Sequence, residues 1–454
     1  MRFWQDITST LKLTIPIVLG QSIPLLMHLV DVMMIGRLGV TELAANGFAT
    51  SLVSFFLVCG MGLCSSVQVE VSQAHGKGDD RACFNGLKHG LLISTIYGAF
   101  WSGVVFFIFD WSYLLGQPEE VVAASRSFVI LLTLSAVPVY AFQCLKNYYE
   151  ARQAPWTPLW LRAAGLLLNI FLNWLFIFGN WGFPAMGVAG AGLATLCVRV
   201  ILLLVLCVLI FKQPWLQTLS LRLFDWLHFS REGISRALNI GVPAAIHAFF
   251  SMGMYSVAGL MFGWLGGDTI AASNIVMRYA NFMLMIPLGT SFAATVQVGN
   301  AVGIGQWKWA RRRGWICIFG CTLLMVVCAV LTFSLRGMLP VLFTADTELT
   351  ALTTVYFGIA AWIQVADGLQ FSALGALRGF ADVKLPALIG FIGYWCVALT
   401  AAYVFAFMFE MGGNGIWLGL FTGLAVTSLS LVVRFHLISQ RHCQQWVNKS
   451  SAML

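Results

Sequence analysis

The chain has 454 residues, of which 59% are hydrophobic and only 10% are charged. Soluble domains carry roughly 25% charged residues, and a water-soluble fold of this length has too small an interior for so much apolar surface, so the composition excludes a soluble globular protein. The net charge of +8 would suit a nucleic-acid-binding protein, but the distribution of the charges along the chain has another explanation.

Apolar runs of about 20 residues, the length that crosses a bilayer, recur twelve times along the chain. The first run follows the segment MRFWQDITSTLKLT. This segment lacks the charged start and cleavage site of a secretory signal, so we expect the run to stay in place as a membrane helix. The predicted spans are residues 13–35, 46–72, 90–109, 127–148, 161–179, 190–211, 238–264, 272–302, 312–334, 353–377, 386–409 and 415–438.

The connections between the predicted spans differ in charge. Lys and Arg occur mainly in the N-terminal segment, in every second connection and at the C-terminal end, whereas the other connections contain only Arg37, Arg126 and Arg336. Because Lys and Arg are retained on the cytoplasmic side of a membrane, we expect both termini to be cytoplasmic. The basic charge is thus a signal of membrane topology, and no nucleic-acid partner is expected.

The second half of the chain repeats the first at an offset of 227 residues. IPIVLGQS at 15–22 aligns with VPAAIHAF at 242–249, and NYYEARQAPWTP at 147–158 resembles ALRGFADVKLP at 376–386. Six spans per repeat is an even number, so the halves share one orientation, and we expect a pseudo-two-fold axis along the membrane normal. The predicted fold is an all-α membrane protein with twelve transmembrane helices in two six-helix lobes. Its predicted parts are an N-lobe at 1–211, a cytoplasmic linker at 212–237, a C-lobe at 238–440 and a cytoplasmic tail at 441–454.

Four segments of the chain resemble the multidrug and toxic compound extrusion (MATE) family, and look closest to its NorM-like bacterial branch. They are LVDVMMIGRLG in the first predicted span, LLNIFLNWLFIFG in the fifth, GVAGAGLAT at the start of the sixth and ADGLQFSALGALRGFADVKLP from the tenth into the following loop. Their order on twelve spans extends the resemblance over nearly the whole chain.

The resemblance implies an antiporter that expels cationic small molecules by alternating access in exchange for sodium or protons. Such a protein is not an enzyme and needs no cofactor beyond the coupling ion. The resemblance also implies a multi-pass protein of the bacterial cytoplasmic (inner) membrane, with lipid as its surroundings, and we expect it to function as a monomer.

Polar groups inside a bilayer are costly, so those within the spans are candidates for an ion site. Asp31 lies in the first span, Asn169 and Asn173 lie at i and i+4 in the fifth, and Thr195 lies in the sixth. All four are predicted about 7–15 Å below the outer rim at 1.5 Å per residue. Carboxylate, amide and hydroxyl oxygens suit sodium, and these positions match the family's cation site. Two further candidates on the helical face of Asp31 are Gln21 and His28.

The second half offers another polar set in the seventh and tenth spans. Asp367 matches the family's acidic residue in this lobe, and Gln364 lies on the same helical face. Ser251 stands where NorM-like proteins usually carry a glutamate, which puts a sodium site in this lobe in doubt. His247, one turn earlier, is a titratable alternative or a hydrogen-bonded structural histidine.

Other functions and roles are open at this point. The Asn and Thr side chains also fit plain interhelical hydrogen bonding. The chain contains no phosphate-binding GxxxxGK[ST] loop, so ATP-driven pumping by this chain alone is not expected. An exporter of a lipid-linked or other endogenous metabolite is the nearest alternative, and a receptor or channel without coupled transport is a more distant one.

Overall fold

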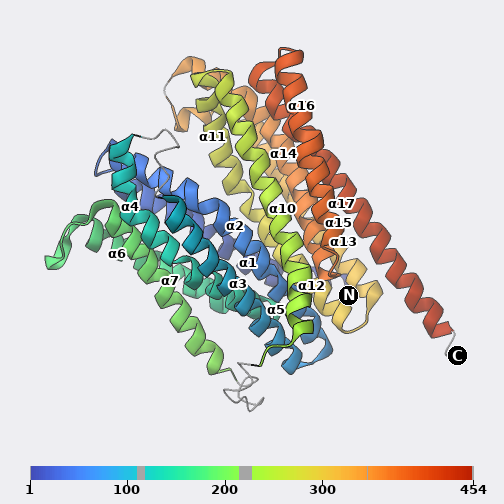
Figure 1. Ribbon diagram of the computed structural model, residues 1–454. Coiled ribbons are helices and arrows are strands. Elements are labelled where there is room, and N and C mark those ends of the chain that lie inside the picture. The colour runs from blue at the N-terminus through green and yellow to red at the C-terminus, as the bar shows by residue number, and fades with distance from the viewer. Residues whose placement is uncertain (1, 110–117, 214–227, 345, 452–454) are drawn as a thin grey trace. The chain divides into compact units, whose positions relative to one another are not determined.

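A computed structural model describes residues 2–109, 118–213, 228–344 and 346–451 of the chain. Throughout these ranges the regular structure is helical, and twelve helical segments are long and apolar enough to cross a membrane. The chain is therefore a multi-pass membrane protein, and the predicted all-α fold with twelve spans is confirmed (Figure 1). The predicted pseudo-two-fold axis stays a prediction.

The first six spans are formed by seven α-helices. These are α1 (Arg2–Ile35), α2 (Val40–Lys77), α3 (Asp80–Phe109), α4 (Glu119–Leu134), α5 (Ala136–Ala151), α6 (Trp156–Phe178) and α7 (Gly187–Phe211), with a short 3₁₀ turn η2 (Asn180–Gly182) between α6 and α7. Several helices are longer than the predicted spans, because an apolar run marks only the part of a helix that meets hydrocarbon.

The last six spans contain more interruptions. Their elements are α10 (Arg231–Trp264), α11 (Gly267–Met283), α12 (Met285–Gly303), α13 (Trp307–Leu335), η3 (Pro340–Leu342), α14 (Thr347–Gly379), α15 (Lys384–Phe391), η4 (Ile392–Ala398), α16 (Leu399–Tyr403), η5 (Val404–Met408) and α17 (Gly412–Ser451). The eleventh span is one continuous run in which η4 and η5 are π-helical segments. Predicted linker residues 214–227 lie outside the described ranges.

Two spans divide into two helices near a proline. α4 ends at Leu134, whose carbonyl would normally accept from the N–H of residue 138, but that residue is Pro138. In the same way α11 ends at Met283, four residues before Pro287. Each division therefore lies where a proline removes one hydrogen bond from the helical ladder.

The chain folds into two compact units, and neither coincides with the N-terminal or the C-terminal half of the sequence. One consists of Leu19–Ala245, and the other combines Met1–Val18 with Ile246–Leu454. The predicted lobe boundary in the linker differs from this division. Since α1 and α10 are each unbroken, each helix begins in one unit and continues into the other.

The Leu19–Ala245 unit has a core formed mainly by α2, α3, α5 and α7. Tyr140 and Tyr148 are among its fully buried side chains. The Tyr140 hydroxyl donates a hydrogen bond of 2.9 Å to the carbonyl of Phe56 on α2. The tyrosines thus fill the space between the helices and also satisfy a backbone group away from water.

The other unit has a core in which Phe262 on α10, Tyr356 on α14, Tyr394 on η4 and Trp417 on α17 are all buried. Figure 1 shows α14 and α17 side by side, in agreement with their packing.

Three glycines of α17 lie against the eleventh span. A Cβ atom on Gly415, Gly419 or Gly423 would collide with the backbone of Ala406, Ala402 or Ala398, respectively. Small residues at every fourth position let two membrane helices approach closely, and van der Waals packing then holds them together.

We expect Gly419→Val to destabilise the protein, because its side chain would occupy the backbone position of Ala402. Overpacking of this kind costs about 1–3 kcal/mol or more. The measurement is the thermal unfolding midpoint of the detergent-purified protein. Gly320→Val on α13 is the matched control, since a Cβ there meets nothing within 4 Å. Equal midpoints for the two variants would contradict this account of the packing.

Candidate functional site

A hydrogen-bonded polar cluster joins α1 to α6 in the Leu19–Ala245 unit. The Nδ2 atom of Asn173 donates to Asp31 Oδ1 at 2.5 Å and to Asn169 Oδ1 at 3.3 Å. Both asparagines are fully buried, and their i, i+4 spacing places them on one face of α6. The structure thus brings together three of the four residues predicted for the cation site.

Among the described residues, Asn173 Oδ1 and Asn169 Nδ2 make no hydrogen bond of good geometry, although Asn169 lies within hydrogen-bonding reach of Asp31. Unpaired polar atoms in a buried site are costly, so their presence beside a carboxylate marks a place where a further group can bind. Rotation of the Asn173 amide by half a turn would exchange its nitrogen and oxygen. The rotated amide would present an oxygen to the same side as the Asp31 carboxylate.

The other predicted members of this site lie apart from the hydrogen bonds of Asp31. Thr195 is buried on α7, but within the described ranges it makes no hydrogen bond to Asp31. Gln21 accepts a hydrogen bond of 3.2 Å from Arg162 on α6. His28 has an exposed side chain, although the sequence placed it on the face of Asp31.

Arg199, a charged residue within the sixth span, lies near this cluster. It lies on α7 one turn after Thr195, within range of an electrostatic interaction with Asp31. Its guanidinium also donates to the hydroxyl of Ser135, the residue between α4 and α5. A positive charge inside an apolar span was the only signal available from the sequence.

A second buried network extends from Arg162, near the start of α6. Arg162 is 8% exposed and donates to the Gly20 carbonyl at 2.8 Å and to Gln143 Oε1 at 2.9 Å. Gln143 in turn donates to Asn147, which donates to the carbonyl of Cys64. Nearby, Lys146 forms an ion pair of 2.8 Å with Glu150, and both side chains are buried.

The polar cluster of the other unit is centred on Tyr394. Its hydroxyl accepts from Gln370 Nε2 at 2.6 Å and lies 3.4 Å from His247 Nε2. Ser251 also lies within hydrogen-bonding reach of this hydroxyl. His247 and Ser251, on α10, thus share one partner. Tyr394 lies in the π-helical segment η4, and such segments often occur at functional sites.

Asp367 lies on α14, 8% exposed, and in the described structure accepts no side-chain hydrogen bond. Tyr394 and Tyr255 are within range of an electrostatic interaction with it. Gln364, predicted on the same face, instead exchanges hydrogen bonds with Thr332 on α13. Asp367 is therefore the residue of this set that stays available to a further group.

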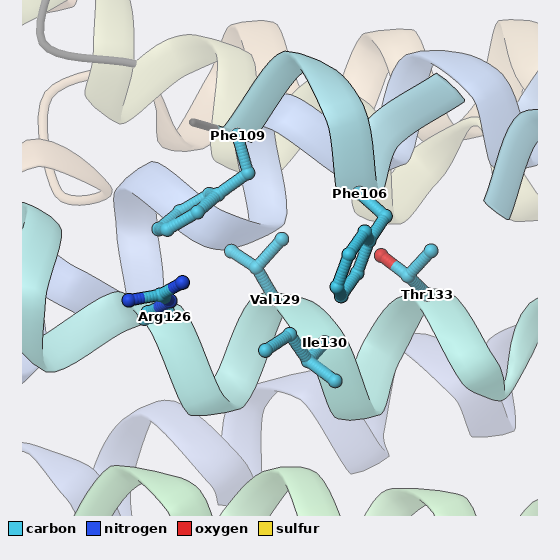
Figure 2. Close-up of a pocket in the computed structure, with 6 residues that line it drawn as sticks. All are labelled: Phe106, Phe109, Arg126, Val129, Ile130 and Thr133. Atoms are coloured by element: carbon cyan, nitrogen blue, oxygen red, sulfur yellow. The ribbon is translucent and has the colours of Figure 1, made fainter. Parts of the chain in front are cut away.

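A small recess between α3 and α4 is lined by none of the predicted site residues. Figure 2 shows its walls, in which aromatic and aliphatic side chains predominate. The lining residues are Phe106, Phe109, Arg126, Val129, Ile130 and Thr133.

The fold has counterparts among solved membrane transporters. The protein described as eukaryotic MATE transporter AtDTX14 superposes with a TM-score of 0.87 at 19% identity, over 98% of this chain and 99% of that one. A multidrug resistance MATE family transporter of the MOP superfamily, in an outward-facing conformation, gives 0.89 at 18% identity over 96% of each chain. The fold is that of this class of transporters.

Sequence comparison identifies the family directly. The family model MatE matches residues 16–175 and 243–404. A Synechocystis protein described as probable multidrug resistance protein NorM is 31% identical over 440 residues, which are 95% of this chain and 94% of that protein. The chain belongs to the MatE family of multidrug efflux transporters, and the resemblance seen in its sequence motifs is confirmed.

We expect Tyr394→Phe to lower the stability of the unit that contains Asp367. The change removes the hydroxyl shared by Gln370 and His247, and an unsatisfied buried partner costs about 1–3 kcal/mol. The thermal unfolding midpoint in detergent measures the effect. Tyr403→Phe is the control, because Tyr403 lies on the same span with 53% of its surface exposed. A larger fall in the unfolding midpoint for Tyr403→Phe would contradict the proposed role of the Tyr394 hydroxyl as the shared partner of Gln370 and His247.

Proposed function

We propose that this protein is a secondary active multidrug efflux antiporter, which exports organic cations in exchange for sodium or protons. The observation that carries the proposal is the cluster of Asp31, Asn169 and Asn173, in which a carboxylate within a membrane span has two amides as neighbours. A carboxylate in lipid is costly unless its charge is neutralised, so the cluster is suited to a group that binds and releases a cation.

Binding of either candidate ion at Asp31 requires the same change in the orientation of the Asn173 amide. A sodium ion needs oxygen ligands, and a protonated Asp31 carboxyl would need an acceptor for its own O–H group. In each case the Asn173 amide has to turn its oxygen toward Asp31, in place of the nitrogen that now donates to it. Ion binding therefore replaces the hydrogen bond between α1 and α6 with a contact of different geometry.

This exchange supplies the coupling that antiport requires. A ligand shifts a conformational equilibrium only by its difference in affinity for the two states. An ion that rearranges the contact between α1 and α6 has such a difference, so it favours one orientation of the transporter, and the cationic substrate favours the other. We keep Asp367 as a candidate cation-coupling residue of the other unit, since it accepts no side-chain hydrogen bond in the described structure, and we assign substrate contacts to His247 and Ser251.

We expect Asp31→Asn to reduce ion-driven efflux to the level of cells without the protein, with unchanged expression. The amide has the same shape, but it neither takes up a proton nor offers a negative charge to sodium. The assay is dye efflux from vesicles with sodium and pH gradients imposed separately. Asp268→Asn, at the exposed start of α11, is the matched control. Full ion-driven efflux by Asp31→Asn would refute the proposed role.

We also propose that the protein resides in the bacterial cytoplasmic membrane as a monomer with both termini cytoplasmic. The support is the excess of Lys and Arg on the side of the termini. Alkaline phosphatase fused to the C-terminus is expected to be inactive, and inserted near Gly182 between α6 and α7 it is expected to be active. The reverse pattern would contradict the orientation.

A further inference from the structure

Two prolines lie within α1, and the second of them is close to Asp31. Pro24 has no N–H group, so the carbonyl four residues earlier, that of Gly20, has no donor within the helix. In a membrane span no water replaces the lost bond, and an unpaired carbonyl there is unfavourable. Another part of the protein has to supply the missing donor.

Arg162 supplies it. The Nη1 atom of Arg162 donates to the Gly20 carbonyl at 2.8 Å and also to Gln21 Oε1 at 3.2 Å. Gly20 is buried, and a Cβ at this position would lie 3.9 Å from Leu159 on α6. α6 thus passes close to the Gly20 backbone, within reach of the Arg162 guanidinium.

The register of the two helices connects this contact with the ion cluster. Gly20 and Asp31 are eleven residues apart on α1, and their partners Arg162 and Asn173 are eleven residues apart on α6. Eleven residues are about three helical turns, or roughly 16 Å, so both contacts lie on one face of each helix. α1 is therefore held to α6 at two points, with Pro24 between them.

The cost of burying Arg162 indicates that the contact matters. A cation within a membrane span is unfavourable. Among the described residues, the opposite charge that acts on Arg162 is Glu150, which is already paired with Lys146. Its third hydrogen bond fixes the other guanidinium nitrogen on Gln143 of α5. The guanidinium fork, which has several donors in fixed directions, suits such a task better than an ammonium group does.

The repeat in the sequence provides an internal comparison. In the second half, Gly20 aligns with His247 and Pro24 with Ser251 at the offset of 227 residues. One residue is inserted before Pro386, the counterpart of Pro158, so Arg162 aligns with Gly390. There Gly390 packs against the His247 ring, and a Cβ on it would approach that ring to 2.8 Å. In the first half the glycine is on α1 and the large side chain on α6, whereas in the second half the large side chain, His247, is on α10 and the glycine is Gly390. Because residue 251 is a serine with its own N–H group, the carbonyl of His247 needs no donor from outside the helix, and the position of Arg162 is taken by a glycine.

We propose that Arg162 is a positioning residue, which replaces the backbone hydrogen bond lost at Pro24 and so keeps the segment of α1 that carries Asp31 in register with Asn173. The expected effect of Arg162 on transport rests on the proposed function. The structural part of this role, the dependence of the α1 segment on Arg162 because of Pro24, stands independently of what the protein transports.

The first test is a double-mutant cycle measured by hydrogen exchange of the purified full chain in detergent. Arg162→Met is expected to speed exchange of the amides between residues 20 and 30 by at least about ten-fold, the effect of a lost charged hydrogen bond. Pro24→Ala restores an N–H donor for Gly20, so Pro24→Ala/Arg162→Met is expected to exchange more slowly than Arg162→Met. Equal exchange in the single and double variants would overturn the proposal.

Two further variants keep this test decisive. Pro16→Ala restores a donor to the carbonyl of Lys12, which Arg162 does not contact, so Pro16→Ala/Arg162→Met is expected to exchange as fast as Arg162→Met. Rescue by Pro16→Ala as well would overturn the proposal, because it would indicate general stiffening of α1. Arg162→Lys keeps the charge beside Glu150 and serves as the background for the same cycle if Arg162→Met does not accumulate.

The second test separates positioning from simple stability. If Arg162 positions Asp31, Arg162→Lys shifts the half-saturating concentration of the coupling ion by about five-fold or more, and Pro24→Ala in addition moves it back. A purely structural role would lower the amount of folded transporter and leave that concentration unchanged, which would overturn the proposal. Loss of ion dependence in the wild type would instead refute the proposed antiport, and the exchange cycle would still decide the role of Arg162.

Discussion

Backbone groups inside a bilayer have no water to bond, and the rest of the structure depends on this constraint. It makes every span helical. It also means that each proline inside a helical span leaves one backbone carbonyl without its usual donor. Near Pro138 and Pro287 the chain divides into two helices. At Pro24 the helix continues, because Arg162 donates to the carbonyl that the proline leaves without a partner. The same physical deficit thus has two outcomes: a division of the span into two helices, or a continuous helix in which, at Pro24, a neighbouring side chain supplies the donor.

Much of the fold was predictable from the sequence, because apolar length and charge distribution follow directly from the properties of the bilayer. The motifs also indicated the family. The candidate site was predictable in part: the spacing of Asn169 and Asn173 placed them on one face, and depth along the helices placed Asp31 at their level. The exposure of His28 depends on the rotation of α1 about its own axis, which packing sets and a helical periodicity does not.

The buried charges were harder to foresee. Lys146, Glu150 and Arg162 lie near the ends of apolar runs, where a charge is normally solvated, and the sequence does not reveal that neighbouring helices cover them. Nor does it reveal that Tyr394 connects Gln370 with His247, since this contact joins three helical elements distant in sequence. In both cases the signal lies in tertiary packing. The two units differ most in these contacts, although the repeat gives them related helices.

The path of α1 and α10 bears on the origin of the repeat. Each unit includes half of a helix whose remainder belongs to the other unit, and the two exchange points, after Val18 and after Ala245, are equivalent in the repeat. A single ancestral repeat would therefore have lacked part of its own unit. Two copies would have completed each other by swapping half-helices, as in a domain-swapped homodimer. Duplication and fusion of such a repeat would make that exchange internal to one polypeptide.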